Sequence, residues 1–181
     1  MNNDITINNT AYLPNYQTIV QSSDNNVATI NQTTGINNSV NGVQTGTSDI
    51  LAMTQTGSFN SSTVNQGGGE TNNALVSQVG DSNTSTINQN VADTNGGNSA
   101  SVLQQGNTNI ASVTQTGTTD NAQITQTGDF NSSVINQSNG VANNALVSQV
   151  GNHNVSTIEQ NPSDTTTVSY THLTLPTICS V

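Results

Sequence analysis

Positively charged side chains are absent from this chain. It contains no lysine and no arginine among 181 residues, against ten aspartates and glutamates. Lysine and arginine neutralise the phosphates of nucleic acids and of anionic lipid headgroups, so the composition argues against a nucleic-acid or membrane-surface partner. No stretch has the roughly 18 apolar residues of a spanning helix, so membrane insertion is not expected either.

Apolar and aromatic residues are also scarce. Only 30% of the residues are hydrophobic, 3% are aromatic, and tryptophan is absent. A thick globular core cannot be filled from this composition. Such a chain is expected to be disordered unless a regular order in its sequence provides another way to bury apolar surface.

Proline is confined to the two ends of the sequence, cysteine occurs once, and no secretion signal is recognisable. Proline occurs only at positions 14, 162 and 176. The segment from Gln21 to Gln160 therefore has none, as expected where every amide donates to a β-ladder. Cys179 is the single cysteine, so no disulfide is predicted. The first residues contain no basic n-region and no apolar h-region, and no signal peptide is visible.

Glutamine recurs at a nearly fixed interval. Thirteen of the sixteen glutamines are spaced by eleven or twelve residues, with one step of fifteen between Gln89 and Gln104. An asparagine stands six residues before nearly every one, and Asp49 or Asp120 takes that place in two units. The glutamines are Gln21, Gln32, Gln44, Gln55, Gln66, Gln78, Gln89, Gln104, Gln115, Gln126, Gln137, Gln149 and Gln160. The asparagines are Asn26, Asn38, Asn60, Asn72, Asn83, Asn98, Asn109, Asn131, Asn143 and Asn154.

A longer period lies over the first. The run NNALVSQVG occurs at 72–80 and again at 143–151, and FNSS begins at both Phe59 and Phe130. The offset of 71 residues equals six units including the long step, which indicates that a block of six units was duplicated.

Within each unit the residues alternate as in a β-strand. Even offsets from the asparagine carry a small residue, an aliphatic residue and then glutamine, as in Asn26-Ala28-Ile30-Gln32, while odd offsets are mostly serine, threonine and asparagine. A period of two puts these sets on opposite faces of a strand, whereas offsets of two and four do not share a helix face. The pattern predicts that the repeated glutamines and asparagines point inward as structural ladders.

Glycine, often two residues after the glutamine, predicts a tight turn between units. Two strands make a rung of 22 or 23 residues, and thirteen strands make about six and a half rungs. The predicted fold class is all-β, a cross-β solenoid with two strands per rung. Each rung buries about two aliphatic side chains at ~1.5–3 kcal/mol each, so stability must come from stacked backbone and amide ladders.

The spacing Asn72-x5-Gln78-x-Gly80-x2-Asn83-x5-Gln89 resembles the curlin repeat of curli fimbriae, S/N-x5-Q-x-G-x2-N-x5-Q. Further copies begin at Asn98 and Asn143, and the resemblance covers residues 15–160. It implies a secreted subunit of the extracellular, cell-surface fibres that act in biofilm matrix and adhesion. The implied partners are copies of the chain itself, a nucleator subunit and an outer-membrane secretion pore.

Residues 15–160 are thus predicted to form the solenoid, between a leader segment at 1–14 and a disordered tail at 161–181. Within the tail, residues 168–181 read VSYTHLTLPTICSV and break the repeat. This segment resembles a translated transposase sequencing adapter. In that case His172, Pro176 and Cys179 have no biological role, and six and a half rungs is a lower bound.

No catalytic, cofactor or metal site is predicted. His153 stands alone in a turn, without a second histidine or native cysteine to complete a zinc site. Asp93 and Asn95 lie in the long step, where few oxygen ligands are available, so a plain loop is favoured over a calcium site. The carboxylates are scattered over turns and do not form the concentrated cleft that an enzyme needs.

Two irregularities concern packing. Gly42 occupies an inward position that elsewhere holds isoleucine or valine, while Leu51 and Met53 are larger than usual, which predicts compensation of volume across a thin core. Phe59 and Phe130 precede the unit asparagine and are expected in turns, either capping the core or promoting lateral bundling.

Two non-amyloid solenoids are the alternatives. An ice-binding solenoid needs a flat Thr-x-Thr array, and the outward runs Val27-Thr29-Asn31 and Ile50-Ala52-Thr54 are too irregular for one. An adhesin or phage-fibre stalk would carry a capping or receptor-binding domain, and no such segment is recognisable.

Overall fold

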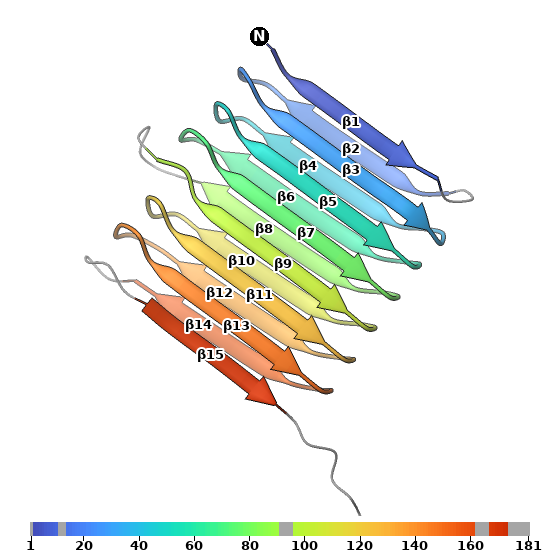
Figure 1. The fold of residues 1–181 in the computed structure, drawn as a ribbon. Coiled ribbons are helices and arrows are strands. Elements are labelled where there is room, and N and C mark those ends of the chain that lie inside the picture. The colour runs from blue at the N-terminus through green and yellow to red at the C-terminus, as the bar shows by residue number, and fades with distance from the viewer. Residues whose placement is uncertain (1, 11–13, 91–95, 162–166, 174–181) are drawn as a thin grey trace, which may run out of the picture.

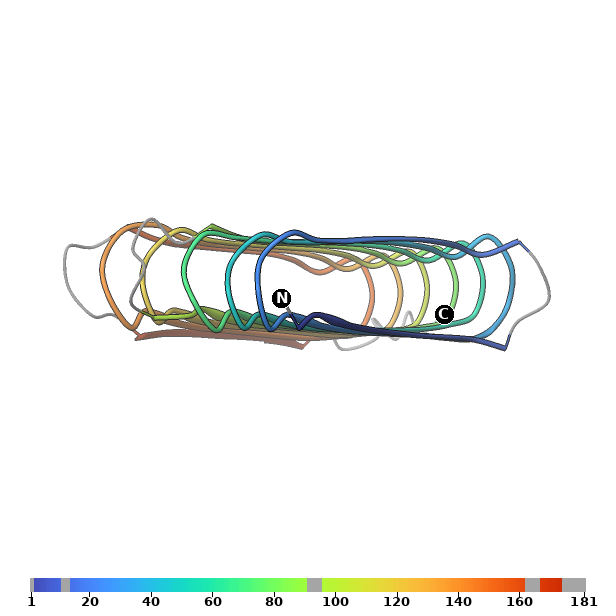
Figure 2. The same ribbon diagram turned by 90° about the horizontal axis from the view of Figure 1, so that it is seen from above.

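Fifteen β-strands in two parallel sheets make up the described part of the chain. The computed structural model describes residues 2–10, 14–90, 96–161 and 167–173, and these contain no helix. Consecutive strands alternate between the two sheets, so each pair completes one turn of a flattened solenoid (Figures 1 and 2). The predicted all-β solenoid with two strands per rung is confirmed.

The odd-numbered strands form one sheet and the even-numbered strands form the other. The odd sheet contains β1 (Asp4–Asn9), β3 (Val27–Thr34), β5 (Ile50–Thr56), β7 (Asn73–Val79), β9 (Ser99–Gln105), β11 (Asn121–Thr127), β13 (Asn144–Val150) and β15 (Thr167–Leu173). The even sheet contains β2 (Tyr16–Gln21), β4 (Ser39–Gln44), β6 (Ser61–Gly67), β8 (Thr84–Asn90), β10 (Ile110–Gln115), β12 (Ser132–Gln137) and β14 (Val155–Gln160).

Neighbouring strands pair in parallel, with equivalent residues of successive units side by side. Gln44 lies opposite Gln66 in the even sheet, and Gln55 lies opposite Gln78 in the odd sheet. The register is the same on both sides of the long connection between β8 and β9, as the pairing of Gln78 with Gln104 shows. The extra residues of that connection are therefore accommodated without a slip of either sheet.

The solenoid extends beyond the predicted range 15–160 at both ends. β1 lies within the supposed leader and pairs with β3, with Asn9 in the place of a ladder glutamine opposite Gln32. β15 lies within the supposed disordered tail and pairs with β13. A sheet edge offers unpaired backbone groups to any extended segment, and the β15 sequence TVSYTHL is rich in β-branched and aromatic residues. Positions 162–166 and 174–181 of the predicted tail lie outside the described residues.

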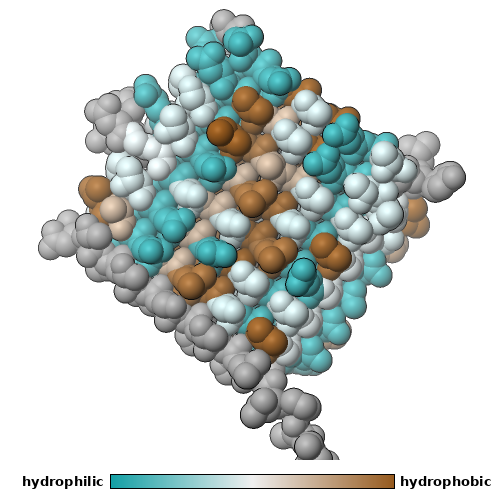
Figure 3. Space-filling view, in the orientation of Figure 1, coloured by the Kyte–Doolittle hydropathy of each residue, from teal (hydrophilic) through white to brown (hydrophobic). Residues whose placement is uncertain are grey.

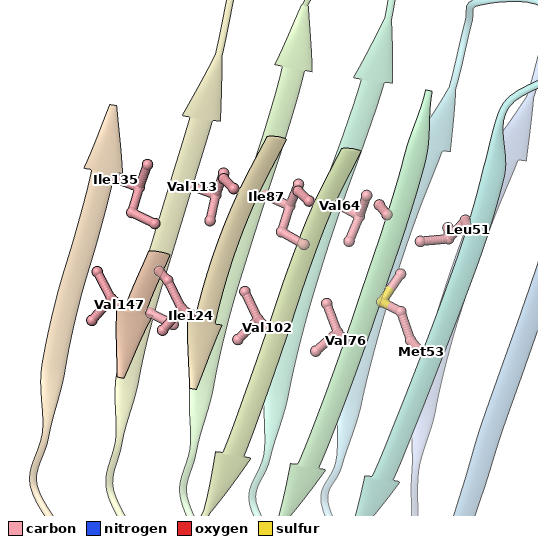
Figure 4. Packing of buried hydrophobic residues seen from close by; sticks show 14 of the residues in the cluster. Leu51, Met53, Val64, Val76, Ile87, Val102, Val113, Ile124, Ile135 and Val147 are labelled. Carbon is pink, nitrogen blue, oxygen red and sulfur yellow. The ribbon is translucent and has the colours of Figure 1, made fainter. Parts of the chain in front are cut away.

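The core is a thin aliphatic layer between the sheets. Figure 4 shows its larger side chains in two facing rows, one from each sheet. From β3 to β14, small residues, alanine or serine, fill the inward positions nearer the asparagines except at Val40 and Leu51, which keeps the sheets close. The buried hydrophobic cluster consists of Ala28, Ile30, Val40, Leu51, Met53, Val64, Ala74, Val76, Ile87, Ala100, Val102, Ala111, Val113, Ala122, Ile124, Ile135, Ala145, Val147 and Ile158.

Gly42 compensates for large neighbours, as its sequence context predicts. A Cβ at this position would lie 2.5 Å from Leu51 Cδ2, 2.9 Å from Ile19 Cδ1 and 3.3 Å from Met53 Cε. The side chains of Leu51 and Met53 therefore occupy the volume that isoleucine or valine fills in other rungs.

The turns bring successive rungs into close backbone contact. Gly80 has φ +115°, and a Cβ there would lie 2.1 Å from the carbonyl oxygen of Gly106 in the next rung. The residue directly before the unit asparagine also has positive φ, for example 61° at Phe59 and 59° at Ser82. Their backbone N–H groups donate to the preceding rung, from Phe59 to Ile36 O (2.9 Å) and from Ser82 to Ser58 O (2.9 Å). These repeated bonds offset the ~1–2 kcal/mol cost of a left-handed residue.

Candidate functional site: amide ladders and open ends

The inward glutamines form a continuous ladder along each sheet. Twelve of the thirteen have at most 4% of their surface exposed, and Gln21, at the N-terminal edge, is half-buried. In every neighbouring pair, Nε2 of one glutamine donates to Oε1 of the glutamine in the next rung, over 2.7–3.1 Å. The even-sheet ladder joins Gln21, Gln44, Gln66, Gln89, Gln115, Gln137 and Gln160. The odd-sheet ladder joins Gln32, Gln55, Gln78, Gln104, Gln126 and Gln149.

The ladder glutamines other than Gln32 also connect the two sheets. In these twelve, the side-chain amide donates a second hydrogen bond to the backbone carbonyl at the start of a strand in the opposite sheet. Gln104 Nε2, for example, donates to Thr84 O over 3.0 Å, and Gln115 Nε2 donates to Ser99 O over 2.9 Å. One glutamine side chain therefore links successive rungs within a sheet and also links the two sheets of the solenoid. This double role explains why glutamine recurs at the strand end.

The unit asparagines form a second pair of ladders with a defined direction. From Asn26 to Asn131, the side-chain Oδ1 of the unit asparagine accepts the backbone N–H of its counterpart in the next rung, as Asn60 Oδ1 does from Asn83 (3.0 Å). The side-chain Nδ2 of Asn60 donates to Gly80 O (2.8 Å) in the turn of that next rung. Both bonds reach toward the C-terminal neighbour. The ten predicted asparagines are buried, namely Asn26, Asn38, Asn60, Asn72, Asn83, Asn98, Asn109, Asn131, Asn143 and Asn154.

Two aspartates interrupt the odd-sheet asparagine ladder. Asp49 and Asp120 are buried, and Oδ1 of Asp49 accepts from both the backbone N–H (2.9 Å) and Nδ2 (3.1 Å) of Asn72. Their Oδ2 atoms are buried without a hydrogen-bond partner among the described residues. An asparagine would place a donor there, whereas a carboxylate cannot donate. Burial raises the pKa of Asp49 to about 6, against the lowering effect of the Asn72 hydrogen bonds and of the nearby Gly46 backbone N–H. It raises the pKa of Asp120 against the same effects of Asn143 and Gly117.

Glycine makes room for these carboxylates. A Cβ at Gly46 would lie 2.7 Å from Asp49 Oδ2, and a Cβ at Gly117 would lie 2.5 Å from Asp120 Oδ2. The same Gly-x-x-Asp arrangement stands in both copies of the duplicated block. The sequence shows the aspartate in the asparagine place, but the unpartnered oxygen is visible only in three dimensions.

The two ends of the even sheet each carry a buried acceptor without a partner among the described residues. At the N-terminal edge this atom is Gln21 Oε1, and at the C-terminal edge it is Asn154 Oδ1. Inside the solenoid, the equivalent atoms accept from the glutamine amide of the previous rung and from the backbone N–H of the next rung. The ends of the ladder are thus chemically different from each other.

The turn aromatics do not cap the core. Phe59 and Phe130 lie in turns as expected but are 56% and 54% exposed. The Phe130 ring stacks on the ring of His153, with centroids 5.0 Å apart and planes 12° from parallel. Sequence reasoning placed His153 in a turn without a partner and missed this contact, because the two residues are neighbours only when the rungs are stacked.

No group of three or more His, Cys, Asp or Glu residues that could hold a metal lies within the described part of the chain. The loop residues considered for calcium, Asp93 and Asn95, lie outside it. The described residues include no helix long and apolar enough to cross a membrane. Comparisons with protein-family models, curated proteins and solved structures find no match for this chain.

Proposed function

We propose that this chain is a structural subunit that stacks end to end with its own copies into an extracellular, curli-like amyloid fibre. The observation that carries the proposal is the pair of buried acceptors at opposite ends of the even sheet, Gln21 Oε1 and Asn154 Oδ1. Each buried polar atom without a partner costs roughly 1–3 kcal/mol, so a contact that supplies both donors is favourable.

A second copy of the chain supplies those donors. When its β2 follows β14 with the spacing that relates β12 to β14, the backbone N–H of its Asn15 reaches Asn154 Oδ1. This bond repeats the one from the Asn154 backbone N–H to Asn131 Oδ1 (3.0 Å). Gln21 Oε1 of that copy then lies where a ladder glutamine accepts from the rung before it, as Gln44 Oε1 accepts from Gln21 (2.7 Å).

The direction of the ladders fixes the polarity of the fibre. Each asparagine bonds toward its C-terminal neighbour, so the N-terminal end of one copy fits the C-terminal end of another. Contacts of this head-to-tail kind do not close on themselves and generate open filaments. The exposed strand edges at β2 and β14 add backbone donors and acceptors to the same joint.

The resemblance of 72–89, 98–115 and 143–160 to the curlin repeat supports the biological setting. On this proposal the subunit is secreted through an outer-membrane pore, growth starts on a nucleator subunit, and the fibre serves biofilm matrix and adhesion. The alternative of ice binding has no support from the outward rows. Thr29, Ala52, Leu75, Ser101, Gln123 and Leu146 are neighbours in one row of the odd sheet, which is no threonine array.

Fibre diffraction of the purified chain tests the proposal. We expect fibres that bind thioflavin and give a meridional reflection near 4.7–4.8 Å, the spacing of stacked rungs. A chain that stays monomeric at high concentration for days, without thioflavin binding, contradicts the proposal.

A further inference from the structure

The outward face of the odd sheet carries a continuous apolar band. The band consists of Val27, Ile50, Ala52, Leu75, Val79 and Leu103, on β3, β5, β7 and β9. Ile50 is 49% exposed and Leu75 is 46% exposed. Strand register joins the band, because Val27 lies beside Ile50 and Ala52 lies beside Leu75. Figure 3 shows hydrophobic side chains gathered over the middle of this face.

The outward face of the even sheet lacks such a band. Its outward apolar residues are scattered, with Tyr16 and Val20 on β2, Val43 beside Val20 on β4, Ile110 on β10, Val134 on β12 and Val155 on β14. The outward positions of β6 and β8 between them are polar, namely Ser61, Thr63, Asn65, Thr84, Thr86 and Asn88. The two broad faces therefore differ: apolar side chains adjoin one another from β3 to β9 on the odd face, whereas on the even face they are dispersed among polar ones.

Part of the band recurs in the second copy of the duplicated block. Leu146 and Val150, on β13, hold the positions of Leu75 and Val79 and are also exposed. The band itself ends at β9, because the outward residues of β11, Asn121, Gln123, Thr125 and Thr127, are polar, so Leu146 and Val150 form a separate apolar patch on β13. Continuous exposed apolar surface of this kind marks an interaction site more often than a free surface.

Charge decides which partner fits the face. From β3 to β13, the outward positions of the odd sheet hold no charged side chain, whereas Asp24, Glu70, Asp81 and Asp129 lie in turns. The chain has no lysine or arginine, so two copies cannot attract each other through ion pairs. Close approach of two copies is therefore favoured at uncharged, apolar surface. The even face is also uncharged up to β12, so the apolar band is what distinguishes the odd face.

The area of the face suits a stable pair. Six strands at ~4.8 Å and about seven residues at ~3.3 Å give a face on the order of 650 Å², close to the ~800 Å² per partner of a standard interface. We propose that the odd face docks against the odd face of a second copy about a two-fold axis. The two apolar bands then form a dry interface between laterally paired solenoids. Pairing does not require end-to-end growth and can be measured on soluble chains.

Two double variants of the full chain test the proposal. Ile50→Ser with Leu75→Ser removes the centre of the band, and Ile110→Ser with Val155→Ser removes similarly exposed side chains from the even face. Scanning transmission electron microscopy gives the mass per length of fibres, and sedimentation equilibrium gives the mass of soluble chains. We expect paired solenoids for the unaltered chain and the even-face variant, and a two-fold lower mass for the band variant. Pairing that survives in the band variant, or is lost equally in the even-face variant, overturns the proposal.

A spin label separates loss of pairing from loss of folding. Leu75→Cys in a Cys179→Ser background places a nitroxide near the middle of the odd face, and Thr86→Cys places one on the even face. Sheets that pack face to face lie ~10 Å apart, whereas stacked copies repeat only every ~35 Å along the fibre. Strong dipolar broadening at position 75 and none at position 86 is expected. Absence of broadening at position 75, in chains with the circular dichroism of the unaltered solenoid, overturns the proposal even if fibres form.

Discussion

Gln104 shows how much a single ladder residue contributes. Its Oε1 accepts from Gln78 Nε2 (2.9 Å), and its Nε2 donates to Gln126 Oε1 (3.0 Å) and to Thr84 O (3.0 Å). Gln104→Leu removes these bonds and leaves buried groups of both neighbouring glutamines short of a partner, at roughly 1–3 kcal/mol for each. We expect a lower temperature of unfolding and slower fibre growth, measured by circular dichroism and thioflavin kinetics.

Thr86→Ser is the control for that substitution. Thr86 lies on the outward face of β8 and takes no part in the glutamine ladders. Its replacement by serine should change neither unfolding nor growth measurably, since surface substitutions usually stay within about 0.5 kcal/mol. Equal effects of the two substitutions would contradict a stabilising inward ladder.

Single residues also show where sequence reasoning stops. The glutamine and asparagine series is visible because burial imposes one residue type on each rung. The left-handed position before the asparagine has no such signature, since Phe59, Thr71, Ser82 and His153 all occupy it. There the backbone hydrogen bonds between rungs, rather than the side chain, set the conformation. The unpartnered oxygen of Asp49 likewise depends on the carbonyl and amide groups of neighbouring rungs, which a linear pattern does not contain.

At the scale of strands, the pattern predicts β2 to β14 and the register of their pairing. It misses β1, because Asn9 stands at the position that defines the repeat by glutamine, although Asn3, Ile5 and Ile7 keep the alternation. It misses β15 for a different reason. The segment Thr167–Leu173 departs from the repeat. Its pairing with β13 is a backbone ladder, which does not require the repeated glutamine and asparagine side chains.

β15 is predicted to oppose end-to-end growth. A second copy whose β2 follows β14 brings its β1 beside β13, the place that β15 holds. Displacing β15 breaks ladder hydrogen bonds worth ~0.5–1.5 kcal/mol each. Deletion of residues 161–181 should therefore shorten the lag of fibre growth in thioflavin assays. A tail of the same length with Thr167–Leu173 replaced by glycine and serine should behave like the deletion. An unchanged or longer lag in both variants would show that β15 does not compete for this edge.

The whole molecule carries ten acids with no cation to offset them. Six of them form two classes that are expected to respond differently to salt. Asp24, Glu70, Asp81 and Asp129 lie in turns between strands. Repulsion between exposed charges is screened beyond ~8–10 Å at physiological salt, so added salt should weaken the repulsion that these four carboxylates exert on an approaching copy. Asp49 and Asp120 are buried in the odd-sheet ladder, and salt should not relieve the cost of their unpartnered Oδ2 atoms.

The two buried aspartates, Asp49 and Asp120, predict a pH dependence of the folding stability that persists at high salt. Burial raises the pKa of Asp49 from 3.8 to about 6 and that of Asp120 in the same direction, so the stacked chain binds protons more tightly than the unfolded chain. The resulting stability is fully present below about pH 3.8 and is lost as pH rises through about 6.

Asp49→Asn with Asp120→Asn restores the amide ladder. It should raise the unfolding free energy at pH 7 by roughly 1–3 kcal/mol per site and leave it nearly unchanged at pH 4. Glu159→Gln, on the exposed face of β14, is the matched charge control. If unfolding followed from pH 4 to 8 in high salt keeps its pH dependence in the double variant, the buried aspartates are not its source.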